Sequence, residues 1–240
     1  MAAQNYYLLS ALPHLPALGS APPVRGRAFL DMVDDAPVRP VVDALFLSDD
    51  LLQRDAAAAG ELDEAQPRVL SEAQVAGDAP LPEALALSAE DAGGPRVATG
   101  RTWEAYFRHA AAVAARKNSA FLRAWVGYEV ALRNALAAER ASALGLDPAA
   151  YQVAPDLAGS GGDVDAVVNA WSAAPDPLAG LRALDAARWR WIDDHDAWFT
   201  FEDDELAAYA ARLMLLIRWQ RLETAREQGG EVAPDREVAT

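Results

Sequence analysis

Apolar residues recur with a helical period through most of the second half of the chain. From Trp103 they follow spacings of three, four and seven residues as far as Ala114, which places them on one face of a helix. A second run of the same kind covers residues 121–136, and Gly145 beyond it suits the left-handed cap that ends many helices. The polar residues 116–119 between the runs are either a short break or a turn of one continuous helix. We therefore predict two helices here, or one long one.

Signals for helix starts divide the remainder of this half. Asp147 and Asp176 each stand before a proline, which combines a capping carboxylate with a first-turn proline. Thr200, with Asp203 three residues later, approximates a capping box. Residues 213–217 are apolar on all sides of a helix, which is typical of a central buried helix. The predicted elements are helices at 148–151, 163–171, 177–192 and 203–220, with a flexible connection at 155–162.

The first hundred residues carry a weaker pattern. Ten of the 15 prolines precede residue 100, and proline breaks helix interiors. Residues 41–54 and 83–89 favour helices, residues 5–12 a strand or a short helix, and residues 55–80 show no clear pattern. Alternating strands are not evident. The predicted fold is an all-α multi-helix bundle with a less regular, proline-rich region at 1–100, a helical core domain at 101–228 and a flexible tail at 229–240.

Charge and cysteine content exclude several classes of protein. The chain has 36 acidic and 21 basic residues, for a net charge of −15. A nucleic-acid-binding surface needs the opposite charge, so we expect no nucleic acid as a partner. Because the chain lacks cysteine, it has no disulfide, thiolate metal site or thiol nucleophile.

The apolar start of the chain differs from a signal peptide. No Lys or Arg precedes Arg25, and Pro13, His14 and Pro16 interrupt the apolar stretch. Elsewhere no run reaches the ~20 apolar residues of a membrane span. We therefore expect a cytoplasmic protein without direct membrane insertion.

An acidic stretch around His195 is the strongest candidate for catalysis. Residues 193–196 and 202–205 are almost all acidic, and a histidine with carboxylates can bind a divalent metal that activates water. The His195-Asp196 pair resembles that of helical metal-dependent phosphohydrolases. The other two histidines show no metal-ligand spacing, so the alternative is that these acids are solvated residues at a helix junction. The glycines at 159–162 lack the lysine of a phosphate loop and indicate a linker.

Aromatic and polar residues within the predicted helices indicate structural contacts. Tryptophans at helical spacing beside alanine are typical of core or interface anchors, and line ligand pockets less often. Glu129 and Arg133 are four residues apart and predict an ion pair on one helix face. Asn134 is placed to fasten a neighbouring helix or loop.

Several segments, taken in order, form a recognisable series. They are NYYLLSALP at 5–13, Trp103-Glu104, FLRAW at 121–125 leading to Glu129 and LRN at 132–134, RWRWI at 188–192, FTF at 199–201 and Leu213-Met214 before Arg218-Trp219. This series resembles a bacterial family of uncharacterised proteins encoded beside V/A-type ATPase subunits. The resemblance covers residues 5–13, residues 45–54 less closely, and most of 101–225.

That family is in turn similar to the C-type subunit of the V/A-type ATPases, called d in eukaryotes. This C-type subunit is a helical socket that joins the central shaft to the membrane rotor ring. Residues 129–145 resemble its recurring pattern of an acid, a Leu-x-Asn segment, a later arginine (Arg140) and a closing Leu-Gly-Leu. Asp49-Asp50-Leu51-Leu52 resembles a degenerate earlier copy. Because the C-type subunit is longer and has three related helical units, the resemblance implies a reduced version.

The resemblance implies a non-catalytic coupling or assembly subunit of a V/A-type rotary ATPase, a complex that transports protons or sodium ions. Its partners are other subunits, namely the central shaft and the rotor ring, and its location is cytoplasmic and peripheral at the inner membrane. No catalytic, cofactor-binding or metal-binding residue is implied. The expected structural or partner-contact residues are Tyr6, Tyr7, Trp103, Trp125, Glu129, Arg133, Asn134, Arg140, Trp189, Trp191 and Trp219. The alternatives are a helical metal-dependent phosphohydrolase that uses His195 and nearby acids, and a helical adaptor with an unrelated partner.

Overall fold

The computed structural model of the chain describes residues 2–62, 64–85, 98–160 and 162–231. Within these ranges it contains helices and no strand, which confirms the all-α prediction. The α-helices are α1 (Ala2–Ala11), α2 (Gly26–Met32), α3 (Arg39–Ala58), α4 (Glu72–Ala76), α5 (Ala98–Lys117), α6 (Ala120–Ala143), α7 (Val164–Ser172), α8 (Pro177–His195) and α9 (Asp203–Glu231). Short 3-10 turns are η1 (Glu83–Leu85), η3 (Pro148–Tyr151) and η4 (Pro155–Leu157).

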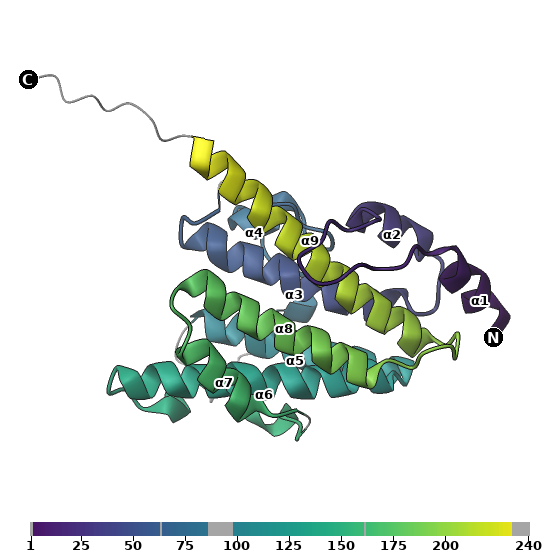
Figure 1. Cartoon of the computed structure of the whole chain (residues 1–240). Coiled ribbons are helices and arrows are strands. Elements are labelled where there is room, and N and C mark those ends of the chain that lie inside the picture. Colours follow the sequence, from purple (N-terminus) through teal and green to yellow (C-terminus); the bar gives the residue numbers. More distant parts are fainter. Residues whose placement is uncertain (1, 63, 86–97, 161, 232–240) are drawn as a thin grey trace, which may run out of the picture.

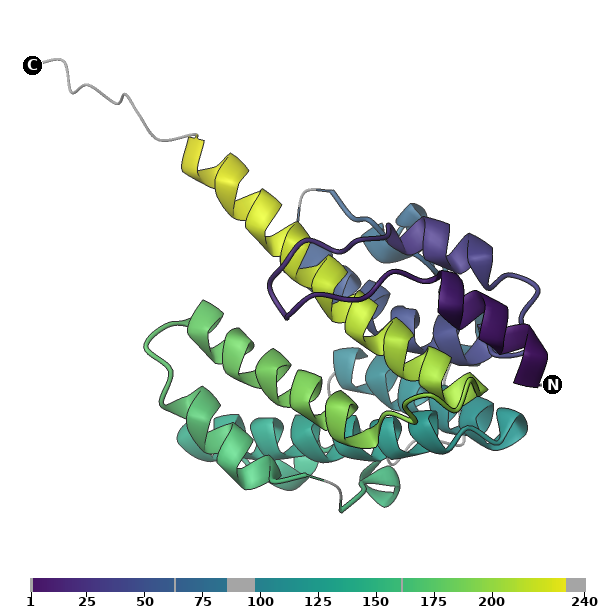
Figure 2. The same ribbon diagram turned by 45° about the vertical axis from the view of Figure 1, so that its right-hand side comes forward.

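Helix α9 runs through the middle of the bundle (Figure 1). It packs against α3 on one side and against α8 and α6 on the other, while α5 packs between α3 and α6. Leu213 to Leu216 are almost fully buried, so the predicted central helix is confirmed. Helices α8 and α9 are joined by a loop at one end and diverge towards the other (Figure 2).

The expected helix boundaries follow capping chemistry closely. Asn118 adopts a φ of 52° and Ser119 then accepts a hydrogen bond from the N–H of Leu122, so α5 and α6 are separate helices. Gly145 has the left-handed φ of 67° that was expected at the end of α6. The Asp147, Asp163 and Asp176 side chains each accept a hydrogen bond from a backbone N–H in the first turn that follows.

The predicted capping box at Thr200 is wrong. Helix α9 begins at Asp203, and the Thr200 hydroxyl accepts from the N–H of Glu202, which precedes the helix. Glu205 instead accepts hydrogen bonds from the N–H groups of Phe199 and Phe201. The loop before α9 is therefore organised by a carboxylate inside the helix.

The N-terminal region contributes directly to the core. Residues 5–12, predicted as a strand or a helix, lie in and just beyond α1, and the predicted helix at 41–54 lies within α3. Phe29, Leu45 and Phe46 are buried in the same cluster as Trp125 and Leu213. One hydrophobic cluster thus joins α2 and α3 to the helices that follow residue 98.

Two predicted segments extend beyond the described residues. The helix expected at 83–89 is a single 3-10 turn at 83–85, and residues 86–89 lie outside the described part of the chain. Helix α9 reaches Glu231, so the first residues of the predicted tail are helical, and residues 232–240 lie outside the description.

Candidate functional site

A chain of buried charges crosses the bundle from α3 to α6. Asp49 of α3 accepts a hydrogen bond from Nε of Arg218 at 3.0 Å, and the same guanidinium reaches Asp185 of α8 at 3.2 Å. Asp185 also accepts from Arg188 at 2.9 Å. Arg188 then binds both carboxylate oxygens of Glu129 at 2.7 and 2.9 Å. Four helices are therefore tied together by ion pairs inside the protein.

Further groups complete the hydrogen bonding of this ion network. Arg221 donates to both oxygens of Asp49 at 2.9 and 3.1 Å, and the Trp219 indole N–H donates to Asp185 at 3.0 Å. The network, which we define as Asp49, Glu129, Asp185, Arg188, Arg218 and Arg221, thus matches three carboxylates with three guanidiniums. This balance offsets the desolvation of the buried ions.

The ion network shifts the pKa values of Asp49 and Arg188 towards the charged forms. Burial by itself raises the pKa of Asp49, but Arg218 and Arg221 outweigh burial and hold that pKa below its usual value. Burial likewise disfavours the Arg188 cation, and Glu129 and Asp185 outweigh it to raise the pKa of Arg188. Both groups are therefore charged at neutral pH.

The adjacent Asp50 has a different environment. Its carboxylate accepts hydrogen bonds from the backbone N–H groups of Arg68, Val69 and Leu70 at 2.9, 2.6 and 2.8 Å. Burial raises the pKa of Asp50 to about 6, against the opposing effect of these hydrogen bonds. Asp50 therefore pins an otherwise irregular segment onto α3.

A cavity of about 450 Å³ opens beside the ion network, between α3, α5, α6, α8 and α9. Its walls are mostly apolar, and Arg188, Arg218 and Arg221 form part of the polar wall. Leu181 of α8 and Leu222 of α9 also line this cavity. These three arginines are already paired with carboxylates, which favours a structural role for them. Arg133 also lines this cavity.

The predicted tryptophans occupy two kinds of position. Trp103, Trp125, Trp191 and Trp219 are buried, whereas Trp189 is half-buried. The rings of Trp125 and Trp191 lie 5.3 Å apart in one aromatic layer between α6 and α8. The Trp103 indole N–H donates to Asp55 at 2.8 Å. These four buried tryptophans therefore belong to the core of the protein.

The predicted ion pair between Glu129 and Arg133 is wrong. Glu129 turns to Arg188 on α8, which offers a bidentate contact that a neighbour on the same helix cannot match. Arg133 lies instead over the Trp103 ring, with its guanidinium carbon 4.0 Å from the ring centroid. Burial lowers the pKa of Arg133 to about 10, with Asp55 and Glu129 acting in the opposite direction.

Asn134 fastens the segment that follows α6, as predicted. Its amide donates to the carbonyl of Val153 at 2.9 Å and accepts from the Val153 N–H at 2.8 Å. Arg140, six residues further along α6, lies with its guanidinium carbon 4.9 Å from the Trp171 ring centroid. Both residues therefore make structural contacts within the chain.

The acids around His195 do not assemble into a metal site within the described residues. The His195 ring stacks on Trp191 with centroids 3.8 Å apart, and its Nδ1 lies 2.8 Å from the Trp191 carbonyl oxygen. Asp193 and Asp196 both bind Arg212 of α9, at 2.9 and 2.5 Å. The expectation that all these acids are solvated is wrong for Asp196, because this ion pair buries it.

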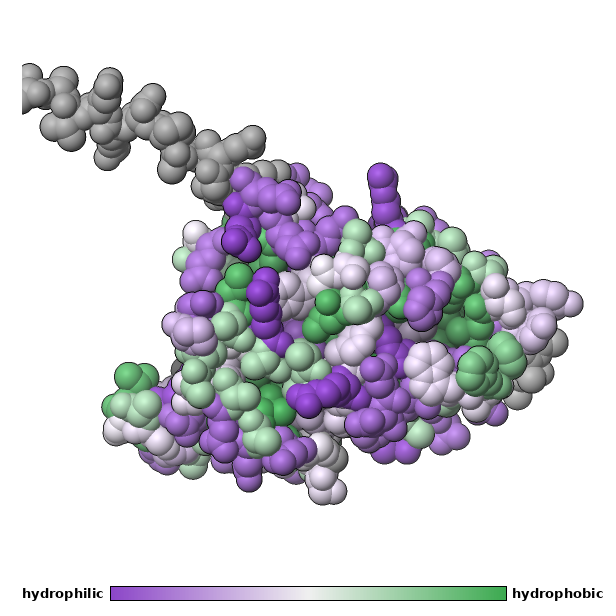
Figure 3. Space-filling model, viewed as in Figure 1, coloured by the Kyte–Doolittle hydropathy of each residue, from purple (hydrophilic) through white to green (hydrophobic). Residues whose placement is uncertain are grey.

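Exposed aromatic side chains gather where α1 meets the α8–α9 loop. Tyr7 and Phe199 are 76% and 81% exposed, Trp198 and Tyr6 are about half exposed, and the Tyr6 ring lies 4.9 Å from Phe201. We define these five residues as the aromatic end. Figure 3 shows hydrophobic side chains among hydrophilic ones in this part of the surface.

The backbone of the aromatic end is strained. Phe199 and Phe201 have φ values of 63° and 56°, in the left-handed region that side chains with a Cβ rarely adopt. Glu205 holds both residues there by accepting from their N–H groups at 3.1 and 2.7 Å. The loop therefore displays its aromatic rings at a cost in backbone energy.

Searches of protein families, curated proteins and solved structures found no match to this chain. In addition, none of the described helices combines the length and hydropathy required to cross a membrane.

Sequence reasoning missed most of the ion network. Asp185, Arg188, Arg218 and Arg221 were not singled out as an interacting group. Asp49 was noted only as part of a degenerate repeat. One available signal was the presence of Arg212 and Arg218 on either side of the fully apolar stretch of α9, because a charge on a buried helix needs a partner.

Proposed function

We propose that the protein is a non-catalytic coupling or assembly subunit of a V/A-type rotary ATPase that docks through its aromatic end. The observation that carries this proposal is the exposure of Tyr6, Tyr7, Trp198 and Phe199 together on one surface. Tyr6 and Tyr7 belong to the segment that resembles the ATPase-associated family. The proposed partners are the central shaft and the rotor ring, at the cytoplasmic side of the inner membrane.

The chemistry of the aromatic end is suited to protein binding. Tyrosine, tryptophan and phenylalanine are enriched in the centres of interfaces, where they bury large areas with few rotatable bonds. A left-handed conformation at both Phe199 and Phe201 lowers stability without any internal packing gain for the exposed Phe199 ring. Binding to a partner provides a reason for this strain.

Charge around the aromatic end supports a partner of the opposite sign. Asp194 and Glu202 are exposed beside the loop. Acidic residues around an apolar centre favour association with a surface that presents apolar side chains within a basic rim. The net charge of −15 strengthens long-range attraction to such a surface.

The ion network supports the mechanical part of the proposal. A subunit that transmits torque or holds two partners in register needs helices that keep their relative positions. Bidentate and shared ion pairs fix α3, α6, α8 and α9 against one another, and arginine–carboxylate pairs of this kind add geometric specificity.

Co-purification with the ATPase tests this proposal. We expect the tagged chain to retain the shaft and ring subunits, and the double variant Trp198→Ser/Phe199→Ser to lose them. Leu144→Ser is the matched control, because Leu144 is 73% exposed at the end of α6, outside the aromatic end. Thermal melting establishes that each variant is folded. Absence of both subunits from the parent preparation, with the partners folded and present, contradicts the proposed function, as does retention by the double variant.

A further inference from the structure

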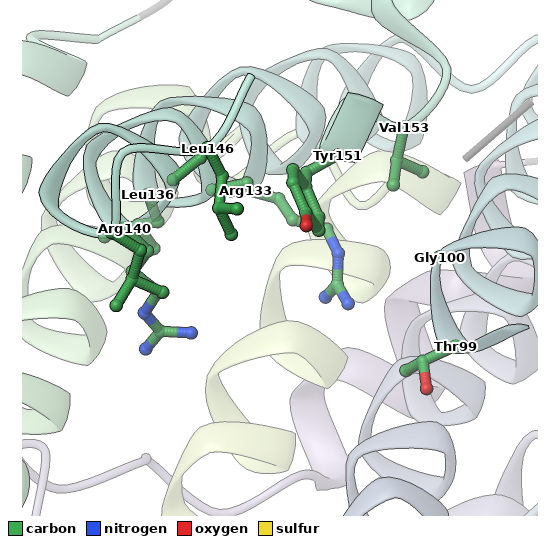
Figure 4. A pocket seen from close by; sticks show the side chains of 11 residues that line it. Thr99, Gly100, Arg133, Leu136, Arg140, Leu146, Tyr151 and Val153 are labelled. Atoms are coloured by element: carbon green, nitrogen blue, oxygen red, sulfur yellow. The ribbon is translucent and has the colours of Figure 1, made fainter. Parts of the chain in front are cut away.

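A second cavity lies on the outer side of α6. It has a volume of about 420 Å³ and is bounded by α6, the first turn of α5 and the segment that follows α6 (Figure 4). This volume is within the ~300–1,000 Å³ range of small-molecule sites. We call this cavity the α6 groove. Its described lining residues are Thr99, Gly100, Arg133, Leu136, Ala137, Arg140, Ala141, Leu144, Leu146, Tyr151 and Val153.

The charge of the α6 groove differs from that of the whole chain. Among the described residues that line it, two are arginines and none is acidic, although acids outnumber bases 36 to 21 in the sequence. Arg133 and Arg140 are seven residues apart, or about two helical turns. Their guanidinium groups extend from α6 to the same side of the groove (Figure 4).

Arg133 has no anion in direct contact among the described residues, and Asp55 and Glu129 act on its charge only from a distance. It is half-buried, and no ion pair or hydrogen bond of its guanidinium is found there; its contact is the face of the Trp103 ring at 4.0 Å. The arginines of the ion network differ, because Arg188, Arg218 and Arg221 each bind a carboxylate. Since a desolvated cation is costly without a counter-ion, Arg133 is suited to receive one from a ligand.

The remaining walls of the α6 groove are apolar and held in place. Leu136, Ala137 and Leu146 offer hydrocarbon surface beside the arginines. Both hydrogen bonds between Asn134 and Val153 fix the segment that closes the groove against α6. The groove is therefore preformed, as most ligand sites are.

We propose that the α6 groove binds a small amphipathic carboxylate, with its hydrocarbon body along the apolar wall and its carboxylate on Arg133 and Arg140. Because the Arg133 guanidinium donates no hydrogen bond among the described residues and contacts Trp103 through the ring face, its N–H groups are suited to a two-point contact with a carboxylate. The first turn of α5, at Thr99 and Gly100, adds the favourable end of a helix dipole. This site is separate from the aromatic end.

Calorimetric titration with decanoate, below its micellar concentration, tests the proposed site. We expect one decanoate per chain, and binding at least tenfold weaker for the neutral analogue decanol. Arg133→Gln should weaken decanoate binding by about tenfold or more, as expected for loss of a hydrogen bond between charged groups. The exposed Arg140 should contribute less, and Arg140→Gln should weaken binding by about threefold.

Two further variants separate ligand binding from folding. Arg123→Gln, also on α6 but exposed outside the groove, should bind decanoate like the parent. Ala137→Trp should fill the groove and abolish binding while the protein retains cooperative melting. The proposal is overturned if decanoate does not bind the parent at millimolar concentration, if decanol binds equally well, or if Arg133→Gln and Arg140→Gln both bind like Arg123→Gln.

Discussion

The ion network and the aromatic end use side chains in opposite ways. In the ion network every buried charge has a partner of opposite sign, and the helices carry regular backbone conformations. At the aromatic end large apolar rings face solvent, and Phe199 and Phe201 adopt left-handed conformations. The first arrangement stabilises the fold, whereas the second lowers its stability. Selection for a stable fold is therefore sufficient to explain the ion network, but it does not explain the exposed and strained aromatic end.

Removing Asp185 should produce the largest loss of stability. Asp185→Ala leaves Arg188, Arg218 and the Trp219 indole without their shared acceptor in the interior. Loss of one partner from a buried ion pair typically costs about 3–5 kcal/mol of unfolding free energy. Urea unfolding measures this change, with the exposed Asp194→Ala on the same helix as the control. Equal midpoints for the two variants would show that the ion network does not hold the helices together.

Asp50 should give stability a pH dependence opposite in sign to that of Asp49. Because the pKa of Asp50 is raised from 3.8 to about 6 on folding, its contribution is fully present below pH 3.8 and is lost as pH rises through about 6. A shift of roughly two units corresponds to on the order of 3 kcal/mol. The pKa of Asp49 is lowered, so its contribution is lost as pH falls.

Asp50→Asn isolates this effect, because the amide does not titrate. Unfolding free energies at pH 4.5 and pH 7.5 should show the variant gaining stability relative to the parent at the higher pH. A difference between variant and parent that is the same at both pH values contradicts the assignment of the raised pKa to Asp50.

Asn134 should have an intermediate effect that is confined to the end of α6. Asn134→Ala leaves both the N–H and the carbonyl of the buried Val153 without their partners, which costs about 1–3 kcal/mol. Hydrogen exchange should show that Asn134→Ala accelerates exchange at Val153, relative to the parent, more than at the centre of α9. The control is Asn169→Ala, at an exposed position on α7. Unchanged exchange at Val153 would contradict a fastening role.

Local patterns predicted the helices well because their causes are local. The apolar spacing from Trp103 and the left-handed Gly145 were sufficient to place α5 and the end of α6. Asp147 and Asp176 were identified at helix starts because a capping carboxylate bonds within its own first turn. The errors in these regions are restricted to boundaries, as at Thr200.

Contacts between distant helices were not predictable in the same way. Glu129 has a favourable neighbour four residues away, and the local rule therefore selected Arg133. The structure gives Glu129 a partner 59 residues away in sequence, Arg188, and leaves Arg133 on Trp103. Helical periodicity specifies which face of a helix is buried and not which helix lies against it. The candidate site therefore emerged only once the packing was known.

The exposed ring of Phe199 offers the sharpest contrast with the ion network. Glycine adopts a φ of 63° without strain, so Phe199→Gly should raise the unfolding free energy by up to about 1 kcal/mol. If the aromatic end serves partner binding, the same substitution should weaken that binding. Stability and affinity would then change in opposite directions.

Titration of the purified ATPase shaft–ring complex with the parent chain and with Phe199→Gly tests the docking proposal most directly. We predict saturable binding of the parent and binding by Phe199→Gly that is at least tenfold weaker, as for an aromatic residue at the centre of an interface. Leu144→Ser is the control, because Leu144 is similarly exposed but lies at the end of α6, outside the aromatic end. This variant should bind like the parent. No binding by the parent, or equal binding by Phe199→Gly, would contradict a docking role for the aromatic end.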